Sequence, residues 1–313
     1  MPIIIENLTH TYMPGSVTQF TALYDINLTV EDGEFFGIIG HTGSGKSTFV
    51  QHLNALIKVP TAEKKYKPKK LKKGEAPPPK IRLTVGGYDL TDKKTDFREL
   101  RSKVGMVFQY PEYQLFAETV FADVAFGLKN FSRAPLSEDE TKKAVRDALE
   151  TVGLDYLELK DRSPFELSGG QKRRVAIAGV LAMEPKVLIL DEPAAGLDPR
   201  GRERILGMLQ ELHREGGVTI VMVSHSMDDC ARLATRMIVM SKGELVLTDT
   251  PRNVFRQADL MRSIGLGVPE AAELCGRLRA AGLQLPDDLF TQEELHDHLL
   301  RLWKEKQEKE AAK

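Results

Sequence analysis

The sequence has few features of a secreted or membrane-spanning protein. Its only two cysteines, Cys230 and Cys275, lie in helical patterns without C-x-x-C spacing, which argues against a disulfide framework and against a zinc site. No run of about eighteen apolar residues occurs, and the chain opens on an apolar strand pattern, so we expect neither a membrane span nor a signal peptide. Reduced thiols in a cytosolic setting fit this composition, and other subunits would have to hold the protein at any membrane.

An excess of either charge is also missing. The net charge is −1 although 28% of the residues are charged, so no overall field attracts nucleic acid, and we expect no nucleic-acid partner. The 313 residues are enough for a full α/β core and for one further small subdomain.

What the chain does have is a phosphate-loop pattern, G-x-x-x-x-G-K-[ST], directly after an apolar segment, Glu34–Ile39, that is typical of a buried strand. Main-chain N–H groups of such a loop point inward around a polyphosphate, and the helix expected over Ser47–Leu56 adds its positive end. We expect Lys46 to reach the β- and γ-phosphates and the Ser47 hydroxyl to bind Mg²⁺. The predicted ATP-binding residues here are Gly40, His41, Thr42, Gly43, Ser44, Gly45, Lys46, Ser47 and Thr48.

A second phosphate site is indicated where Leu167–Gln171 opens a helix expected to run to about Met183. Ser168 is a good N-cap, but Gly169 and Gly170 in the first turn weaken a helix by roughly 1 kcal/mol each relative to alanine. Close approach of bare N–H groups to an anion explains that cost. Two phosphate-binding helix starts in one chain suggest two subunits that share nucleotides across an interface; the second start comprises Ser168, Gly169, Gly170 and Gln171.

Acidic residues follow a continuous apolar strand pattern at Lys186–Leu190, the kind found inside a parallel sheet. We expect Asp191 to help hold Mg²⁺, through water, and Glu192 to polarise an attacking water molecule. Another strand, Val218–Val223, ends just before His225. At that position the His225 imidazole can reach a γ-phosphate.

Gln109 follows the expected strand Lys103–Phe108, and its side chain offers a carbonyl oxygen to Mg²⁺ or to a water and an amide to a partner. The next loop, Tyr110–Phe116, is rich in aromatic residues, which is typical of an interface. Residues 118–160 have mostly helical patterns, among them Glu138–Val152.

The N-terminal region is expected to form strands at residues 3–8 and 23–30, with a further strand at Ile81–Val85. Tyr12 lies between the first two. Its ring has two interpretations: stacking on an adenine base, or simple packing.

The C-terminal region begins with an expected strand pair at Lys242–Thr248 and continues as helices from Pro251. One amphipathic helix is expected at Pro269–Ala281, and a capping box formed by Thr291 and Glu294 begins a second one. These two short helices would suit dimerisation or would simply pack on the core. The charged residues after Trp303 are expected to fray.

Taken together, residues 3–250 resemble an ATP-binding-cassette (ABC) ATPase, most specifically through Leu167–Gln171 combined with the phosphate loop and Leu190–Glu192. The resemblance implies an α/β ABC-type P-loop domain over residues 1–250, with a RecA-like core, an antiparallel β subdomain and a helical subdomain at about 110–182. By analogy with that family, the remaining site residues are the adenine-stacking Tyr12, the Q-loop Gln109, the D-loop Asp198 and the switch His225.

A narrower resemblance, to the ATPases of energy-coupling factor (ECF) transporters, is carried by three stretches. They are Tyr110–Val120, Asp123–Gly127 and Gly170–Pro185, and the residues after Gln109 look like the second of the two ATPase types of those importers. Residues 251–313 are similar to the small helical domain that these ATPases use for pairing. Ala194 stands where threonine is common in the family.

The resemblance implies an ATPase that converts ATP and water to ADP and phosphate and drives uptake of vitamins or transition-metal ions, with Mg²⁺ as cofactor. It implies a head-to-tail dimer with a second ABC ATPase, identical or a paralogue, in which each nucleotide lies between the phosphate loop of one subunit and Ser168–Gln171 of the other. An integral membrane coupling subunit would dock near Gln109–Phe116, with a substrate-binding membrane subunit joined indirectly. The chain would then be peripheral on the cytoplasmic side of the cell membrane.

Two alternatives share the catalytic residues. One is the ATPase of another ABC transporter, which differs only in its partner. The other is a soluble ABC ATPase that works on ribosomes or DNA, but this chain has neither the second cassette nor the long coiled coil usual in such proteins.

Residues 62–80 depart from the family pattern as an unusually long insertion with eight lysines and four prolines. Such a segment cannot bury itself, so we expect a solvated loop. A second hypothesis places its lysines near anionic lipid headgroups, where each charge can add about 1 kcal/mol. Deletion of residues 63–79 should then weaken binding to anionic liposomes in a flotation assay, and unchanged binding would leave only the solvated loop.

Overall fold

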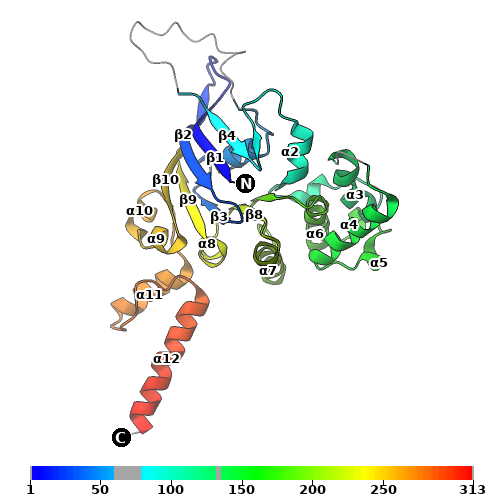
Figure 1. Cartoon of the computed structure of the whole chain (residues 1–313). Helices are drawn as coiled ribbons and strands as arrows, with labels where there is room; N and C mark the ends of the chain where they lie inside the picture. The colour runs from blue at the N-terminus through cyan, green and yellow to red at the C-terminus, as the bar shows by residue number, and fades with distance from the viewer. Residues whose placement is uncertain (1, 60–78, 132–134, 312–313) are drawn as a thin grey trace, which may run out of the picture.

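The computed structural model describes residues 2–59, 79–131 and 135–311. Residues 62–78 of the predicted insertion therefore lie outside the described part of the chain. The described residues form two sheets, a group of helices at one side of them, and a C-terminal set of helices (Figure 1).

A six-stranded sheet in the order β10-β9-β3-β8-β7-β6 lies at the centre. The strands from β9 to β6 are parallel, and β10 joins as an antiparallel edge strand. Every residue of β3, β7 and β8 is buried, as the continuous apolar patterns predict for parallel strands covered on both faces. The bounds are β3 Phe35–Ile39, β6 Val104–Val107, β7 Val187–Asp191, β8 Thr219–Val223, β9 Arg236–Ser241 and β10 Glu244–Asp249.

A four-stranded antiparallel sheet in the order β2-β1-β4-β5 lies beside it (Figure 1). Its apolar side chains share one core with α1 and with Phe36 and Ile38 of β3. Strand β1 continues to Tyr12, beyond the predicted residue 8, because it stays paired with β2 to the end of the hairpin. The bounds are β1 Ile3–Tyr12, β2 Phe20–Val30, β4 Arg82–Val85, β5 Tyr88–Asp89 and α1 Lys46–Leu53.

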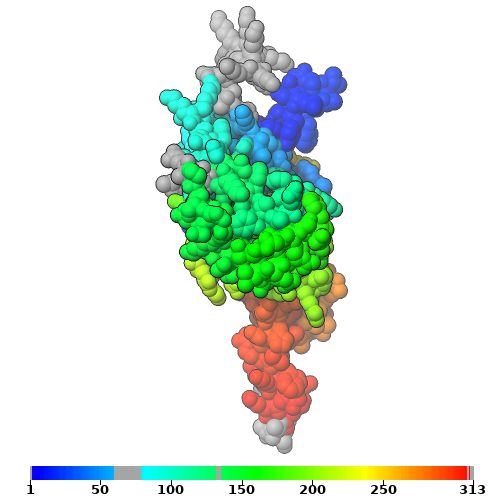
Figure 2. Space-filling view, turned by 90° about the vertical axis from the view of Figure 1, so that its right-hand side faces the viewer, coloured from blue at the N-terminus to red at the C-terminus, as the bar shows by residue number. Residues whose placement is uncertain are grey.

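The helices of residues 111–181 gather at one side of the sheets, where Figure 2 shows them facing the viewer. A second core joins them to the six-stranded sheet through Val175 and Ile177 of α6, Val124 of α3 and Leu188 of β7. This core fixes the position of α6 relative to the strands. The bounds are η1 Pro111–Gln114, α3 Val120–Phe131, α4 Glu138–Thr151, α5 Tyr156–Leu159, η2 Pro164–Glu166 and α6 Gly169–Leu181.

The remaining helices flank the sheet or follow it. Three of them, α2 Phe97–Lys103, α7 Pro199–Gly216 and α8 Met227–Leu233, are absent from the elements predicted from the sequence. The C-terminal helices are α9 Pro251–Phe255, α10 Ala258–Ser263, α11 Glu270–Ala280 and α12 Gln292–Ala311. Figures 1 and 2 show α12 extending away from the rest of the molecule. Within the described ranges, no helix is both long and apolar enough to cross a membrane.

Several predicted boundaries are wrong by a few residues. Helix α1 ends at Leu53 rather than Leu56, because Asn54 leaves the helical conformation and Ala55 has a φ of +56°. The last helix is not short: α12 has 20 residues and continues through positions predicted to fray, up to Ala311. Its predicted capping box is confirmed, since the Glu294 N–H donates to the Thr291 hydroxyl at 3.2 Å and the Thr291 N–H donates to the Glu294 carboxylate at 3.1 Å.

Candidate functional site

The carboxyl ends of four adjacent parallel strands carry the phosphate loop, Gln109, Asp191, Glu192 and His225. Ile38 of β3 pairs with Val223 of β8, Val223 pairs with Asp191 of β7, and Leu190 pairs with Val107 of β6. This register places the loops after β3, β6, β7 and β8 at one edge of the sheet, where ligands of open parallel sheets bind. The phosphate loop therefore lies at the same edge of the sheet as Gln109, the Asp191–Glu192 pair and His225.

The phosphate loop holds its lysine in a buried position. Lys46 is 6% exposed, and its ammonium donates to the carbonyls of Gly40 at 2.6 Å and His41 at 3.1 Å. Burial lowers the pKa of Lys46, while the carboxylates of Glu192 and Asp191 act in the opposite direction. A further negative charge placed beside the ammonium would favour its charged form, so this lysine is suited to an anionic ligand.

Two glycines of the loop are required by close packing. A Cβ on Gly40 would lie 2.4 Å from the Met240 carbonyl oxygen, and a Cβ on Gly45, whose φ is +101°, would lie 2.6 Å from the Ala22 carbonyl oxygen. The loop is therefore pressed between β2 and β9, and only glycine fits at these positions. The remaining loop residues continue the same turn: the Ser44 N–H donates to the His41 carbonyl, and Ser44 Oγ is buried without a hydrogen-bond partner among the described residues.

Ser47 and Asp191 are brought together. Asp191 is 7% exposed, and burial raises the pKa of its carboxyl group, while the nearby Ser47 side chain acts in the opposite direction. A hydroxyl and a carboxylate are hard oxygen donors of the kind that Mg²⁺ prefers. The pair therefore fits a magnesium ion, with the amide oxygen of Gln109, two residues after β6, as a further donor.

The Glu192 carboxylate is hydrogen-bonded to two side chains. One carboxylate oxygen accepts from Gln109 Nε2 at 3.0 Å and the other lies 2.7 Å from His225 Nε2, which must carry a hydrogen to bond a carboxylate. The backbone of Glu192 has a φ of +54°, and its N–H donates to the Val223 carbonyl at 3.0 Å. Both the backbone and the carboxylate are thus fixed at the sheet edge, and the Glu192 side chain remains 15% exposed.

The predicted second phosphate site lies at the exposed start of α6. Ser168 and Gln171 form a capping box, with the Ser168 N–H donating to Gln171 Oε1 at 3.0 Å and the Gln171 N–H donating to Ser168 Oγ at 3.3 Å. A Cβ on Gly169 or Gly170 would meet nothing within 4 Å in the described part of the chain. Packing within the subunit therefore gives no reason for these glycines, which favours close approach by an outside group.

Asp198 caps α7, with its carboxylate accepting from the Gly201 N–H at 2.7 Å. The cap fixes the chain six residues after Glu192. Its predicted nucleotide role stays a prediction.

Tyr12 lies at the end of β1, next to the helix that follows the phosphate loop. Its hydroxyl is 3.1 Å from Thr48 Oγ1, its ring is 39% exposed, and the edge of the His10 ring packs against it with centroids 4.6 Å apart. An exposed aromatic ring joined to the phosphate loop is suited to stacking on a base.

A histidine pair behind Tyr12 was not predicted. His52 of α1 is fully buried and bonds the Thr48 carbonyl through Nδ1 at 2.7 Å, and its Nε2 lies 3.2 Å from His10 Nδ1. Because a carbonyl only accepts, His52 carries its hydrogen on Nδ1, and His10 donates from Nδ1 to His52 Nε2. The one sequence signal is a histidine inside the apolar stripe of α1, beside Phe49 and Leu53.

Comparison with known proteins gives a consistent answer. The family model described as "ABC transporter" matches residues 23–195. The energy-coupling factor transporter ATP-binding protein EcfA2 of Clostridium tetani is 49% identical over 306 residues, covering 98% of this chain and 99% of that protein. The protein of the same name from Caldanaerobacter subterraneus is 50% identical over 301 residues, covering 96% and 97%.

Solved structures agree. CbiO1 of Clostridium perfringens, described as part of the ABC transporter complex CbiONQ, matches with a TM-score of 0.66 at 37% identity, covering 84% of this chain and 93% of that one. The bacterial ABC transporter cassette MJ0796, in a dimeric structure bound to ADP and Pi, matches with a TM-score of 0.66 at 29% identity, covering 80% and 99%.

The buried histidine makes stability depend on pH. Burial lowers the pKa of His52 from its ordinary value of 6.5 to about 4, so between these values the unfolded chain binds more protons and the fold loses stability as the pH falls. We expect the free energy of unfolding to drop by about 2 kcal/mol from pH 8 to pH 5 on this account. His52→Asn keeps an N–H for Thr48 but does not titrate, so urea unfolding should show a flatter pH dependence. His296→Asn on α12 is the control, and an equal flattening there would contradict the assignment.

Proposed function

We propose that this chain, which belongs to the ABC transporter family and is an ATP-binding subunit of the energy-coupling factor type, hydrolyses ATP with Glu192 as the residue that activates water. Hydrolysis is coupled to import of vitamins or transition-metal ions. The hydrogen-bonding of Glu192 is the observation that carries this assignment. Its carboxylate accepts from Gln109 on one side and from His225 on the other, at the sheet edge next to the phosphate loop. A carboxylate held on both sides has a fixed orientation toward the water molecule that it would deprotonate, and a general base needs such an orientation.

The phosphate loop supplies binding and charge. Its N–H groups, from Gly40 to Thr48, surround the β- and γ-phosphates, and the Lys46 ammonium neutralises them. Magnesium, held by Ser47 and Asp191 with Gln109 nearby, would supply charge neutralisation between the two phosphates. The His225 ring sits beside Glu192 with 46% of its side chain exposed, which lets it contact the γ-phosphate as it holds the carboxylate.

The adenine of ATP stacks on Tyr12 in this proposal. The exposed ring lies at the outer end of β1, and its hydroxyl contacts Thr48 at the start of α1. The base and the triphosphate are thereby bound by neighbouring elements.

The subunit acts as one half of a head-to-tail pair of ATPases, identical or paralogous. The support is the glycine pair at the start of α6, where a Cβ added to either glycine would meet nothing within 4 Å among the described residues. Ser168–Gln171 of one subunit covers the nucleotide bound by the phosphate loop of the other, with Asp198 near the same interface. Residues 251–313 form the C-terminal helical pairing region and residues 1–250 the ATPase domain.

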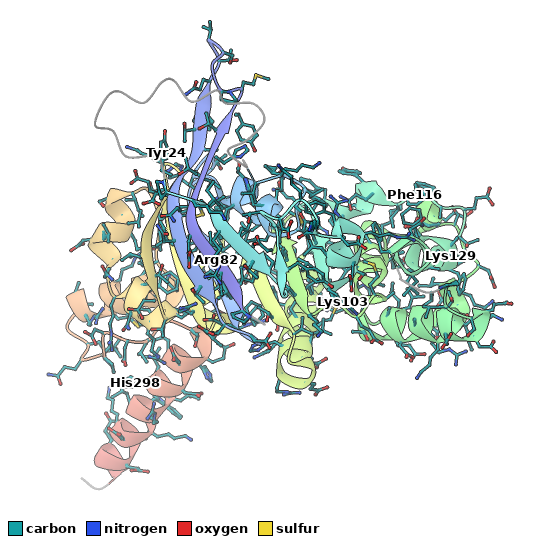
Figure 3. All side chains as sticks on the ribbon, turned by 45° about the horizontal axis from the view of Figure 1, so that its top comes forward. Tyr24, Arg82, Lys103, Phe116, Lys129 and His298 are labelled. Carbon is teal, nitrogen blue, oxygen red and sulfur yellow. The ribbon has the colours of Figure 1, made fainter. Side chains whose placement is uncertain are left out.

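An integral membrane subunit docks at Gln109–Phe116, which would place the chain at the cytoplasmic face of the cell membrane. The support is exposure: Tyr113 is 84% exposed and Phe116 is 59% exposed, and large exposed aromatics mark protein interfaces. Phe116 lies at the helical side of the molecule, away from the C-terminal helices (Figure 3). A substrate-binding membrane subunit is joined indirectly, through the docked subunit.

The two alternative functions receive no specific support. An ATPase of another ABC transporter would share the catalytic residues, but the relatives that match nearly the whole chain carry the energy-coupling factor name. A soluble ABC ATPase would not need the exposed aromatic loop.

Glu192→Gln tests the catalytic assignment. The amide keeps the size and the acceptor oxygen of the carboxylate but cannot take a proton, so we expect turnover to fall by roughly 10²- to 10³-fold while ATP binding and ATP-dependent pairing persist. Phosphate release and light scattering measure the two properties. Glu203→Gln, which alters a carboxylate paired with Arg232 on the α7–α8 side, is the control and should hydrolyse normally. Near-normal turnover by Glu192→Gln would remove Glu192 from this role.

Gentle solubilisation of native membranes and capture of this chain test the partners. We expect an integral membrane subunit and a second ABC ATPase to co-purify, together with a substrate-binding subunit that reveals the cargo. The variant Tyr113→Ala/Phe116→Ala should lose the membrane subunit but keep the second ATPase. Recovery with ribosomes, or alone in the soluble fraction, would contradict the transport role and leave the ATPase chemistry standing.

A further inference from the structure

Arg173 is the largest side chain that is fully buried, at 2% exposure. It lies in the first turns of α6, two residues after Gln171. Arginine is almost never buried without partners, because an unpaired charge away from water is costly. The partners of its guanidinium therefore show what it holds in place.

One set of partners belongs to the segment after Gln109. Arg173 Nε donates to one Glu112 carboxylate oxygen at 3.1 Å and Nη2 donates to the other at 3.3 Å, a two-bond ion pair with η1. The guanidinium also lies 5.9 Å from the centroid of the Tyr110 ring. Arg173 thus fixes the segment proposed to receive the membrane subunit.

The other set of partners belongs to the segment after Glu192. Arg173 Nη1 donates to the Ala195 carbonyl at 2.5 Å and to the Pro193 carbonyl at 3.5 Å. The Ala195 N–H donates in turn to the Glu192 carbonyl at 3.2 Å. These bonds anchor the chain immediately after a residue whose own backbone has a positive φ, a conformation that needs support from its surroundings.

The two segments are also joined at the site itself, where Gln109 bonds the Glu192 carboxylate. They are therefore tied together twice, once by Gln109 and once through Arg173. A displacement of Glu112 pulls on Arg173. Because Arg173 also binds the carbonyls of Pro193 and Ala195, the displacement is passed to the segment that follows Glu192. Stability alone does not account for this arrangement, because a buried ion pair is often no more stabilising than apolar residues of the same volume.

We propose that Arg173 is a positioning residue, paired with Glu112, that transmits the position of the membrane-docking segment to Glu192. The inference rests on the proposed docking at Gln109–Phe116. Since Arg173 lies in the helix that begins with Ser168–Gln171, the same guanidinium also links the docking segment to the helix start proposed to cover the partner's nucleotide. Docking of the membrane subunit then sets the catalytic carboxylate and the helix start together.

Glu112→Gln is the variant that tests the link. It removes the ionic partner at a position 20% exposed and leaves Arg173 bonded to the two carbonyls. In the full transporter, with this chain, its partner ATPase and the membrane subunits expressed together, we expect kcat to fall by about tenfold. The KM for ATP and the ATP bound per folded chain should stay as in the unaltered protein, while the thermal unfolding midpoint falls because a buried guanidinium loses its ionic partner.

Glu34→Gln is the matched control. Glu34 makes a comparable pair with Arg236, at 2.8 Å and 3.1 Å, and is 11% exposed, but it precedes β3 at the opposite end of the strand from the phosphate loop. Loss of an ion pair with only a structural role should change the unfolding midpoint and not kcat per ATP-binding chain. An equal fall in kcat for Glu34→Gln would overturn the proposal.

A double variant shows whether Arg173 and Glu112 act through one shared contact or independently of each other. Arg173→Gln should lower kcat at least as far as Glu112→Gln, and the double variant should be no slower than Arg173→Gln alone, because both changes break one contact. Multiplied losses, or unchanged kcat in Glu112→Gln, would overturn the proposal. Glu192→Gln is measured in the same transporter: if it is inactive while Glu112→Gln is normal, only the Arg173 link fails, whereas an active Glu192→Gln refutes the catalytic assignment itself.

Discussion

The parallel register of β3, β8, β7 and β6 is the constraint on which the site depends. Neighbouring parallel strands end at the same edge of the sheet, so the loops after them bring their side chains together there. Asp191, at the end of β7, pairs with Val223, and the N–H of the next residue, Glu192, donates to the carbonyl of the same Val223. A slip of one residue between these strands would turn the acidic pair to the wrong face of the sheet. The buried apolar strands therefore set the geometry of the polar chemistry.

The helical side of the molecule is held less by the sheet than by α6. Its apolar residues pack into the large core, while its first turns carry both the capped glycine pair and the buried Arg173. One helix thus combines a packing face, an exposed start and an ionic link to two loops. A rigid helix of this kind moves as a unit, so contacts made at one end change the position of groups at the other.

Much of the site can be predicted from sequence because its chemistry is local to the chain. The phosphate loop, the Ser168 N-cap and the capping box at Thr291 each depend on residues a few positions apart, and the structure confirms the N-cap and the capping box. The link between Arg173 and Glu112 spans 61 positions and the His10–His52 contact spans 42, so neither leaves a local pattern. Helix α7 is different, because its signals are local and sequence reasoning missed them: Asp198 is its N-cap, Pro199 is its first residue, and Gly217 ends it after a buried stripe of Ile205, Leu206, Met208 and Leu209.

The chain contains a single tryptophan, Trp303, and it lies on α12 with 58% of its surface exposed. Indole emission depends strongly on contact with water, so the intrinsic ultraviolet fluorescence of this protein reports on the protruding C-terminal helix and not on the catalytic edge. A shift of that emission to shorter wavelength would signal burial of α12 against another surface. Changes at Glu192 would leave the tryptophan emission unaltered unless they change what covers α12. Trp303 is therefore an intrinsic fluorescent label for the C-terminal helix.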